Sequence, residues 1–335
     1  MYNQRALAYN AMIGKMIRKE DIHMDYIKDL RDGDMVTAIY LCKTKNTLQT
    51  KAGKSYYSLL LQDKTGTVDG KVWDLGNGID HFEAMDYIQI SAQVISFQGS
   101  LQLNIKRIRR ADENEYSIDD YMPCTEKNRE DMYRELLGLV ASVKDDNYRS
   151  LLESFFKDKE FAVRFRDHSA AKSIHHAFIG GLLEHTVSVA KMCDFYTTLY
   201  PVLNRDLLIT AALFHDIGKV DEISTFPEND YTDEGQLVGH IVMGTMMLDR
   251  AIRKMENFPV KKANELKHCI LAHHGELEFG SPKKPALIEA VALSYADNTD
   301  AKLESFREIL EGNADNGEWF GFNRMFESNL RHTSK

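Results

Sequence analysis

The chain of 335 residues is poor in cysteine, proline and tryptophan, with four, six and two of each. The cysteines form no C-x-x-C pair and no disulfide-like framework, so we expect reduced thiols. No stretch approaches about eighteen consecutive apolar residues, and the N-terminus has no signal-peptide core. These absences argue against a membrane span and against secretion, and they predict a cytoplasmic protein.

The composition is that of an ordinary globular protein, with 43% hydrophobic and 28% charged residues. A length of 335 residues exceeds one typical core, so we predict two domains. The formal net charge is −9, but residues 31–110 contain eleven Lys and Arg against eight Asp and Glu. The basic excess in this region indicates where an anionic partner such as nucleic acid would bind.

Residues 31–110 consist of short apolar and β-branched runs that are separated by turn signals. The pattern predicts five strands, with a short helix at 78–85 between the third and the fourth. The strands are expected at 35–42, 56–61, 67–73, 87–97 and 101–108. This plan is that of an OB-fold, a partly open barrel whose strand face binds oligonucleotides.

Three residues of the expected barrel, Lys71, Trp73 and Arg107, are predicted nucleic-acid contacts. Cationic side chains can pair with phosphates, and an aromatic ring can stack on a base. Aromatic residues that alternate along barrel strands can equally belong to the core, and this alternative remains open.

The composition changes along the chain and divides it into five segments. We expect an N-terminal segment at 1–30 that packs on the protein or contacts a partner, and an acidic linker at 113–125 that contains Pro123. The remaining segments are the all-β OB domain at 31–112, an all-α domain at 126–320 and a C-terminal tail at 321–335.

The motif F-H-D-I-G-K at 214–219 places an imidazole beside a carboxylate, two kinds of ligand for a divalent metal. His215 aligns with Leu208 and Ala211 on the apolar stripe of a predicted helix. An unpaired Asp216 carboxylate on the same helix would be costly to bury, so the pair needs a partner.

Further histidines and an aspartate occupy apolar positions of other predicted helices. A single inward histidine is more often a hydrogen-bonded core residue, but a metal explains the whole set together. The candidate ligands are His185, His215, Asp216, His240, His273, His274 and Asp297.

The order of these residues resembles the HD-domain metal-dependent phosphohydrolases, over roughly residues 161–320. The resemblance implies an all-helical domain in which His185, His215, Asp216 and Asp297 hold one divalent ion. It also implies a second ion, because the later histidines match the additional ones of two-metal members, with Asp216 as the bridge. Whether His273, His274 or both bind metal stays open.

The barrel and the helical domain together are similar to the YhaM-type 3′→5′ exoribonucleases. The similarity rests on H-H-A-F-I-G-G-L-L-E-H-T at 175–186, L-F-H-D-I-G-K at 213–219 and H-H-G-E-L-E-F-G-S-P at 273–282. It implies trimming of single-stranded RNA, and to some degree single-stranded DNA, from the 3′ end. It further implies two divalent ions, with Mn²⁺ favoured and Co²⁺, Mg²⁺ or Fe²⁺ as alternatives.

Two residues are predicted to be catalytic. Asp216 would bridge the ions, and Lys219, one helical turn later, would stabilise charge on the phosphate. The expected products are nucleoside 5′-monophosphates. His175, His176 and Lys283 are predicted substrate contacts, although the two histidines can equally cap and pack.

Two other functions remain open at this point. One is a small-nucleotide phosphohydrolase or phosphodiesterase, for which the barrel would be superfluous. The other is a non-catalytic nucleic-acid-binding regulator that keeps metal for structure. The exposed helical faces also permit assembly into a homo-oligomer, whose interface the sequence does not place.

Overall fold

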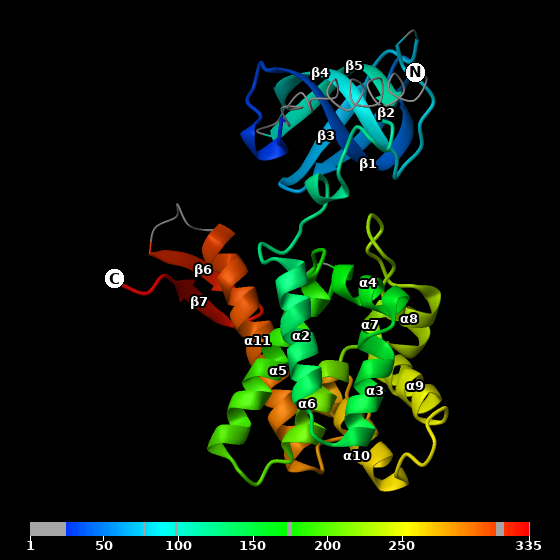
Figure 1. The fold of residues 1–335 in the computed structure, drawn as a ribbon. Coiled ribbons are helices and arrows are strands. Elements are labelled where there is room, and N and C mark those ends of the chain that lie inside the picture. Colours follow the sequence, from blue (N-terminus) through cyan, green and yellow to red (C-terminus); the bar gives the residue numbers. More distant parts are fainter. Residues whose placement is uncertain (1–24, 77, 98–99, 173–175, 313–317, 335) are drawn as a thin grey trace, which may run out of the picture. The chain divides into compact units, whose positions relative to one another are not determined.

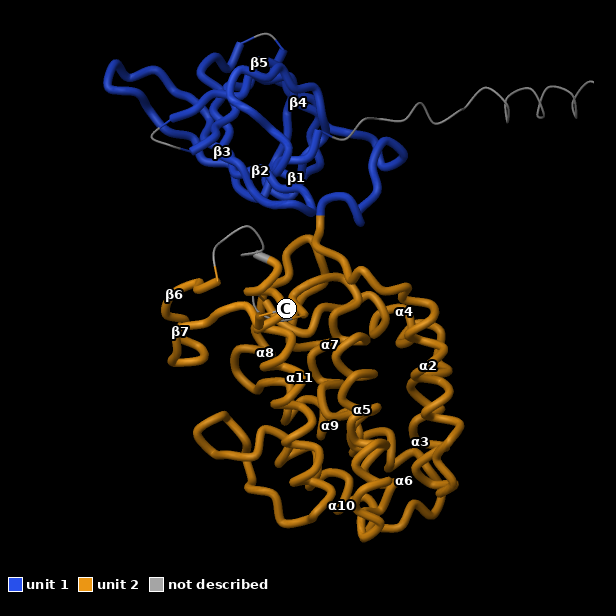
Figure 2. The backbone as a smooth tube through the Cα atoms, turned by 90° about the vertical axis from the view of Figure 1, so that its left-hand side faces the viewer, with its two compact units in different colours: residues 1–121 blue, residues 122–335 orange. Residues whose placement is uncertain are grey.

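The computed structural model describes residues 25–334 apart from 77, 98–99, 173–175 and 313–317. The chain divides into two compact units, residues 1–121 and 122–335 (Figure 2). The first is a β-barrel, and the second is a helical domain that carries a short hairpin (Figure 1). Each unit has its own hydrophobic core.

The barrel closes in the strand order β1-β2-β3-β5-β4. Its neighbouring strands are antiparallel except β3 and β5, which are parallel. The strands are β1 (Met35–Gln49), β2 (Ser55–Asp63), β3 (Gly66–Val72), β4 (Tyr87–Phe97) and β5 (Ser100–Arg110). This topology confirms the predicted OB-fold.

Strand β1 is longer than the pattern predicts, because it continues through the mostly polar residues 43–49. Its first half pairs with β4 as far as Leu41, and its second half pairs with β2. A register shift between Cys42 and Thr44 separates the two halves. Strands β4 and β2 therefore supply the backbone hydrogen bonds of the two halves of β1. The second half is held in the sheet by its pairing with β2 and does not need buried apolar side chains to form a strand.

The helix expected at 78–85 is not formed in the part of this segment that the structure describes. The Ile108 N–H of β5 donates to Gly78 O, and the Asp80 N–H donates to Ile108 O, each at 2.9 Å. Phe82 is 1% exposed and packs in the barrel core. The backbone groups are thus satisfied by a neighbouring strand, and a helix here would have to give up these bonds.

The second unit is helical around a single core, as predicted. Helix α6 is buried over the eight residues 207–214, and α5 and α11 both pack against it. The helices are α2 (Arg129–Ser142), α3 (Asp146–Phe156), α4 (Lys159–Asp167), α5 (Gly181–Leu199), α6 (Arg205–Phe214), α7 (Lys219–Glu222), α8 (Asp233–Val238), α9 (His240–Ile252), α10 (Val260–Leu271) and α11 (Ile288–Gly312).

Local sequence signals start several of these helices. The side chains of Asn128, Asp145 and Asn204 accept hydrogen bonds from backbone N–H groups in the first turns of α2, α3 and α6. Such caps satisfy donors that a helix cannot pair internally. In the part of the chain that the structure covers, no helix is both long and apolar enough to cross a membrane.

Residues 321–335, which we expected as a tail, contribute to an antiparallel hairpin. Its strands are β6 (Trp319–Asn323) and β7 (Ser328–Arg331), which lie beyond α11 (Figure 1). Gly321 has a φ of +87°, and it lies at a register shift that interrupts the pairing. A glycine suits this left-handed backbone conformation.

The expected linker, residues 113–125, contains the boundary between the units. Tyr116 stacks on Tyr87 of the barrel at 4.0 Å between ring centroids, and Tyr121 lies edge-on to Tyr87 at 5.0 Å. In contrast, the Thr125 N–H donates to Ile179 O of the helical unit at 3.0 Å. Of the N-terminal segment, residues 1–24 lie outside the described residues.

Candidate metal centre

The candidate ligands lie where helices of the second unit begin, end or pass through its core. His185 is the fifth residue of α5, His240 is the first residue of α9, and Asp297 lies within α11. The others follow helix ends: His215 and Asp216 follow α6, and His273 and His274 follow α10. The structure brings all seven together.

Close packing at Gly218 helps to bring α9 to this place. A Cβ atom on Gly218 would lie 2.1 Å from His240 O and 2.6 Å from Gly244 N. The start of α9 therefore rests directly on the backbone between Asp216 and α7. This contact places the His240 ring beside the Asp216 carboxylate.

The first group of donor atoms surrounds His185. Its Nε2 lies 3.1 Å from Nε2 of His215 and 3.2 Å from Oδ1 of Asp297. The Asp216 Oδ2 is 3.5 Å from the Nε2 atoms of both histidines. Three of these four side chains are buried, and the Asp297 side chain is 15% exposed.

The second group lies on the other side of Asp216. Its Oδ1 is 3.4 Å from His240 Nε2 and 3.7 Å from His273 Nε2. His274 joins this group, since one ring nitrogen from each of the three histidines lies within 4.8 Å of the others. The structure therefore brings both His273 and His274 to the site.

The Nδ1 atom of each histidine lies next to an oxygen acceptor. The acceptors are Asp300 for His185 (2.7 Å), Ala212 O for His215 (2.8 Å), Glu222 for His240 (3.0 Å), Ile270 O for His273 (2.7 Å) and Phe279 O for His274 (2.8 Å). Each neutral ring therefore keeps its proton on Nδ1 and offers the Nε2 lone pair to the site.

Several of these candidate metal-ligand atoms have no hydrogen-bond partner in the part of the chain that the structure describes. Asp216 Oδ1, His240 Nε2 and His273 Nε2 are buried and have no hydrogen bond among the described residues. Buried polar atoms without partners are costly, and nitrogen and carboxylate donors are the ligands of divalent transition metals. The residues present therefore fit divalent cations.

Two carboxylates behind the histidines were missed in the sequence. Asp300 Oδ2 accepts from His185, and it also lies 3.0 Å from Nε2 of His176. Glu222 accepts from both the backbone N–H and the ring of His240. The only signal for Asp300 in the sequence was its spacing, since it follows Asp297 by one helical turn.

The protonation states follow from burial and from neighbouring charges. Burial alone would raise the pKa of Asp216, but Lys219 and the histidines hold it well below its usual value. Burial would lower the pKa of Lys219, but Asp216 outweighs this effect and raises it. Asp216 is therefore an anion and Lys219 a cation, with Nζ 2.7 Å from Oδ2.

The pKa of His185 is shifted in the opposite direction to those of His215 and His273. Burial would lower its pKa, but hydrogen bonds with Asp297 and Asp300 raise it to about 10. The pKa values of His215 and His273 are lowered, mainly by burial. A cation at this site has to replace the Nε2 proton of His185, whereas the other two rings are already neutral.

The predicted substrate contacts are more dispersed. His175 lies outside the described residues. His176 is buried against Asp300, behind the ligand histidines. Lys283 lines a separate cavity to which no candidate ligand contributes. Trp73 directly follows β3 of the barrel, Lys71 lies within β3 and Arg107 lies within β5.

Comparison with known proteins agrees with this arrangement. The HD domain family matches residues 182–302, a range that contains every candidate ligand. The fold and the site thus define an HD-domain hydrolase. The chain is also 34% identical over 281 residues to the 3′-5′ exoribonuclease YhaM of Bacillus velezensis, covering 83% of this chain and 88% of that protein. The chain therefore belongs to the YhaM family.

Two of the solved structures that are similar to part of this chain are OB-fold domains. One is the second OB-fold domain of replication protein A from Methanococcus maripaludis, with 21% identity over 26% of this chain and 93% of that one, at a TM-score of 0.22. Another is the OB domain of Ta0387 from Thermoplasma acidophilum, with 21% identity over 27% of this chain and 87% of that one, also at 0.22.

Proposed function

We propose that this chain hydrolyses single-stranded RNA, and to some degree single-stranded DNA, from the 3′ end and releases nucleoside 5′-monophosphates. The observation that carries the proposal is the position of Asp216. Its Oδ2 faces His185 and His215, and its Oδ1 faces His240 and His273. A carboxylate between two sets of imidazoles is suited to bridge two divalent ions.

In this proposal the ligands form two sets that share Asp216. The first set is His185, His215, Asp216 and Asp297, and the second is Asp216, His240, His273 and His274. When bound, the ions would lower the pKa of a water molecule and offset negative charge on the scissile phosphate. The mixture of imidazole and carboxylate donors favours Mn²⁺, Co²⁺ or Fe²⁺ over Mg²⁺, which prefers oxygen ligands.

Lys219 supplies a fixed positive charge next to the ligands. Its side chain is 15% exposed, and its Nζ lies 2.7 Å from Asp216 Oδ2. We assign it the role of donating a hydrogen bond to a phosphate oxygen as negative charge develops there. A charged donor held in a buried site stabilises such charge more strongly than one in water.

The barrel would hold the strand upstream of the 3′ end. Trp73 is 42% exposed, and its ring stacks on Tyr56 at 4.6 Å between centroids, so its outer face is a platform for a base. Lys71, whose Nζ lies 2.7 Å from Ser58 Oγ, is on the same strand face. Both residues are suited to a single strand with little sequence preference.

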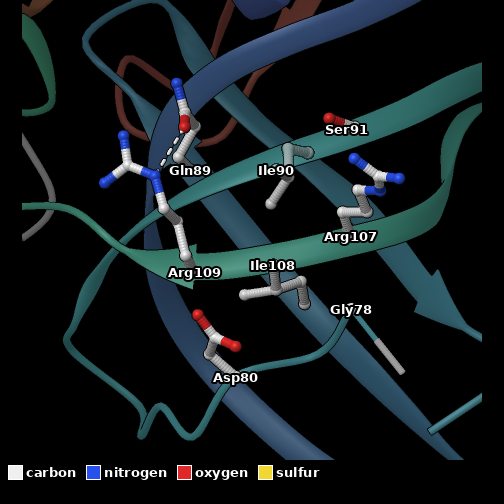
Figure 3. Close-up of a pocket in the computed structure, with 8 residues that line it drawn as sticks. All are labelled: Gly78, Asp80, Gln89, Ile90, Ser91, Arg107, Ile108 and Arg109. Carbon is white, nitrogen blue, oxygen red and sulfur yellow. Dashed lines mark hydrogen bonds between the residues drawn. The ribbon is translucent and has the colours of Figure 1, made fainter. Parts of the chain in front are cut away.

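Arg107 would contact the strand at a second place on the barrel. It lines a cavity of about 460 Å³ together with Asp80, Gln89 and Ser91 (Figure 3). The neighbouring Arg109 is already paired with Glu115 through two bonds of 2.7 Å. Arg107 is therefore the arginine of this cavity that we assign to a phosphate.

The proposal is tested with a time course on 5′-labelled single-stranded RNA, with every product length resolved. With Mn²⁺ the strand should shorten stepwise from its 3′ end, and this ladder should disappear with chelator and in Asp216→Ala. Parallel reactions with Co²⁺, Fe²⁺ and Mg²⁺ establish the metal preference. A strand that stays intact with every metal, while mononucleotides are hydrolysed, would instead establish a small-nucleotide hydrolase.

A further inference from the structure

A second cavity of about 840 Å³ lies in the helical unit. It is formed by one face of α9, one face of α10 and residues 283–286, and none of the candidate metal ligands lines it. Helices α9 and α10 pack side by side (Figure 1). The cavity is large enough for a nucleotide, since small-molecule sites range from about 300 to 1,000 Å³.

The charge of this cavity is positive, although the whole chain has a formal net charge of −9. Its lining contains the cations Arg250, Lys267, Lys283 and Lys284 and one carboxylate, Asp249. Four cations around one cavity in an acidic chain repel one another unless an anion is near.

Two of the four cations are neutralised within the protein. Lys267 Nζ lies 3.0 Å from Asp249 Oδ1, and Lys284 Nζ lies 2.6 Å from Glu276 Oε2. Arg250 and Lys283 form no ion pair with any residue that the structure describes. The cavity thus presents two cationic groups that are available to a ligand.

The segment that carries Lys283 is fixed in place by hydrogen bonds to α10. Ser281 Oγ donates to Leu271 O at 3.0 Å, and the Ala286 N–H donates to Nε2 of His268 at 2.9 Å. Burial and the nearby Lys283 lower the pKa of His268, so the ring is neutral and can accept this bond. A fixed segment loses less entropy when a ligand binds.

We propose that this cavity is a phosphate-binding site, distinct from the metal centre, in which Arg250 and Lys283 bind the phosphate group of a nucleotide. The nucleotide part of this inference rests on the proposed function. The phosphate belongs either to the backbone of a bound RNA strand or to a free nucleoside 5′-monophosphate. Met246 and Leu271 in the same lining supply apolar surface against which a base can pack.

The chain connects this cavity to the metal centre. The segment between His274 and Lys283 is short, and His274 is tied to it by the bond from Nδ1 to Phe279 O. Lys283 and the candidate ligand His274 therefore belong to one short, fixed segment.

The test is equilibrium binding in the presence of EDTA, so that no hydrolysis occurs. The probes are a fluorescein-labelled 12-nucleotide RNA, AMP, and adenosine as the ligand without phosphate. The double variant Arg250→Gln/Lys283→Gln is compared with the wild type. Lys261→Gln is the control, since Lys261 is also on α10 and its side chain is 90% exposed and outside the cavity.

We expect the double variant to lose about tenfold or more in affinity for a phosphate-bearing probe, whereas Lys261→Gln matches the wild type. A loss of affinity for the RNA alone assigns the site to the strand. In that case the slope of log affinity against log salt concentration should become shallower by about 0.7 for each lost phosphate contact. A loss for AMP, with no binding of adenosine, assigns it to a free nucleotide.

Unchanged affinity for both probes, in a double variant that unfolds at the wild-type temperature, overturns the proposal. This result is distinguishable from failure of the proposed function. Failure of the proposed function is an absence of RNA hydrolysis with metal present, which the binding assay does not measure.

Discussion

At the scale of single residues, the metal centre depends on what lies behind its histidines. Among the five histidines, His185 and His240 bond to carboxylates, whereas the Nδ1 atoms of the other three face backbone carbonyl oxygens. A carboxylate acceptor makes the imidazole more basic and fixes its orientation, so it strengthens a bond from Nε2 to metal. Asp300 and Glu222 are therefore expected to contribute to metal affinity without binding the metal themselves.

The first prediction concerns Asp300. Replacing it with Asn removes the charge that His185, His176 and Ser188 share. We expect metal affinity to fall by about 10- to 100-fold, because such supporting partners orient the ligand. Calorimetric titration of the metal-free protein with Mn²⁺ measures this change.

The control for this prediction is Asp146→Asn, because the Asp146 side chain is 85% exposed and pairs only with Arg149 among the described residues. The Glu222→Gln variant should weaken the group that contains His240 to a similar extent. Full metal affinity in Asp300→Asn would show that His185 is oriented by packing alone.

A second prediction concerns His168, which is buried outside the metal centre. Its ring nitrogens lie 2.9 Å from Ser169 O and 3.1 Å from Ile223 O, and burial lowers its pKa below the usual 6.5. Below pH 6.5 the unfolded chain therefore binds more protons than the folded one. The contribution of His168 to the free energy of unfolding is therefore fully present above pH 6.5. It is lost as the pH falls, by up to about 1.4 kcal/mol for each pH unit.

Chemical unfolding of the wild type and of His168→Gln at several pH values between 5 and 8 measures the effect. The free energy of unfolding should fall more steeply below pH 6.5 in the wild type than in the variant. Parallel profiles for the two proteins would mean that His168 keeps an ordinary pKa in the folded state.

At the scale of the elements, the contact between Gly218 and α9 determines where His240 lies. A third prediction is that Gly218→Ala destabilises the helical unit by more than about 1–3 kcal/mol, the usual cost of overpacking. The added Cβ would meet backbone atoms of His240 and Gly244 rather than a flexible side chain. The temperature of thermal unfolding and the hydrolytic activity should both fall.

The matched control is Gly138→Ala. Gly138 lies on the exposed face of α2, and nothing lies within 4 Å of the place its Cβ would take. This substitution should stabilise the helix by about 0.5–1 kcal/mol, since alanine is the better helix former. If Gly218→Ala behaves like Gly138→Ala, then α9 can shift without cost and the contact does not position His240.

The elements also show which parts of the structure could be predicted from the sequence. The gathering of the candidate ligands was predictable in part from apolar helical stripes, which carry His185, His215 and Asp297. The places of His240, His273 and His274 were predicted from the resemblance to two-metal HD domains. The prediction of a helix at 78–85 was wrong, because two backbone hydrogen bonds with Ile108 of β5 outweighed local helix propensity. Asp300 and Glu222 were missed because a carboxylate that orients an imidazole has no pattern beyond its spacing.

At the scale of the whole molecule, the change from period-two alternation to helical periodicity predicted two separate units. The boundary itself was harder to place, because residues 113–125 contribute to both. Tyr121 is 1% exposed in the barrel unit, while Pro123 O accepts from Ile179 N of the helical unit at 2.8 Å. A truncation that tests the units separately should therefore begin at Met122 rather than within the acidic stretch.

The last prediction concerns this truncation. Residues 122–335 retain the helical core and every candidate ligand, so the fragment should fold and hydrolyse a dinucleotide at a rate close to that of the full chain. It should bind a long single strand at least about tenfold more weakly, since each stacked base is worth about 1–3 kcal/mol and Trp73 and Lys71 are absent. Turnover of dinucleotide and 20-nucleotide RNA, measured side by side, separates the two effects. If a folded, metal-loaded fragment cannot cleave even the dinucleotide, the barrel takes part in the chemistry and does not only hold the strand.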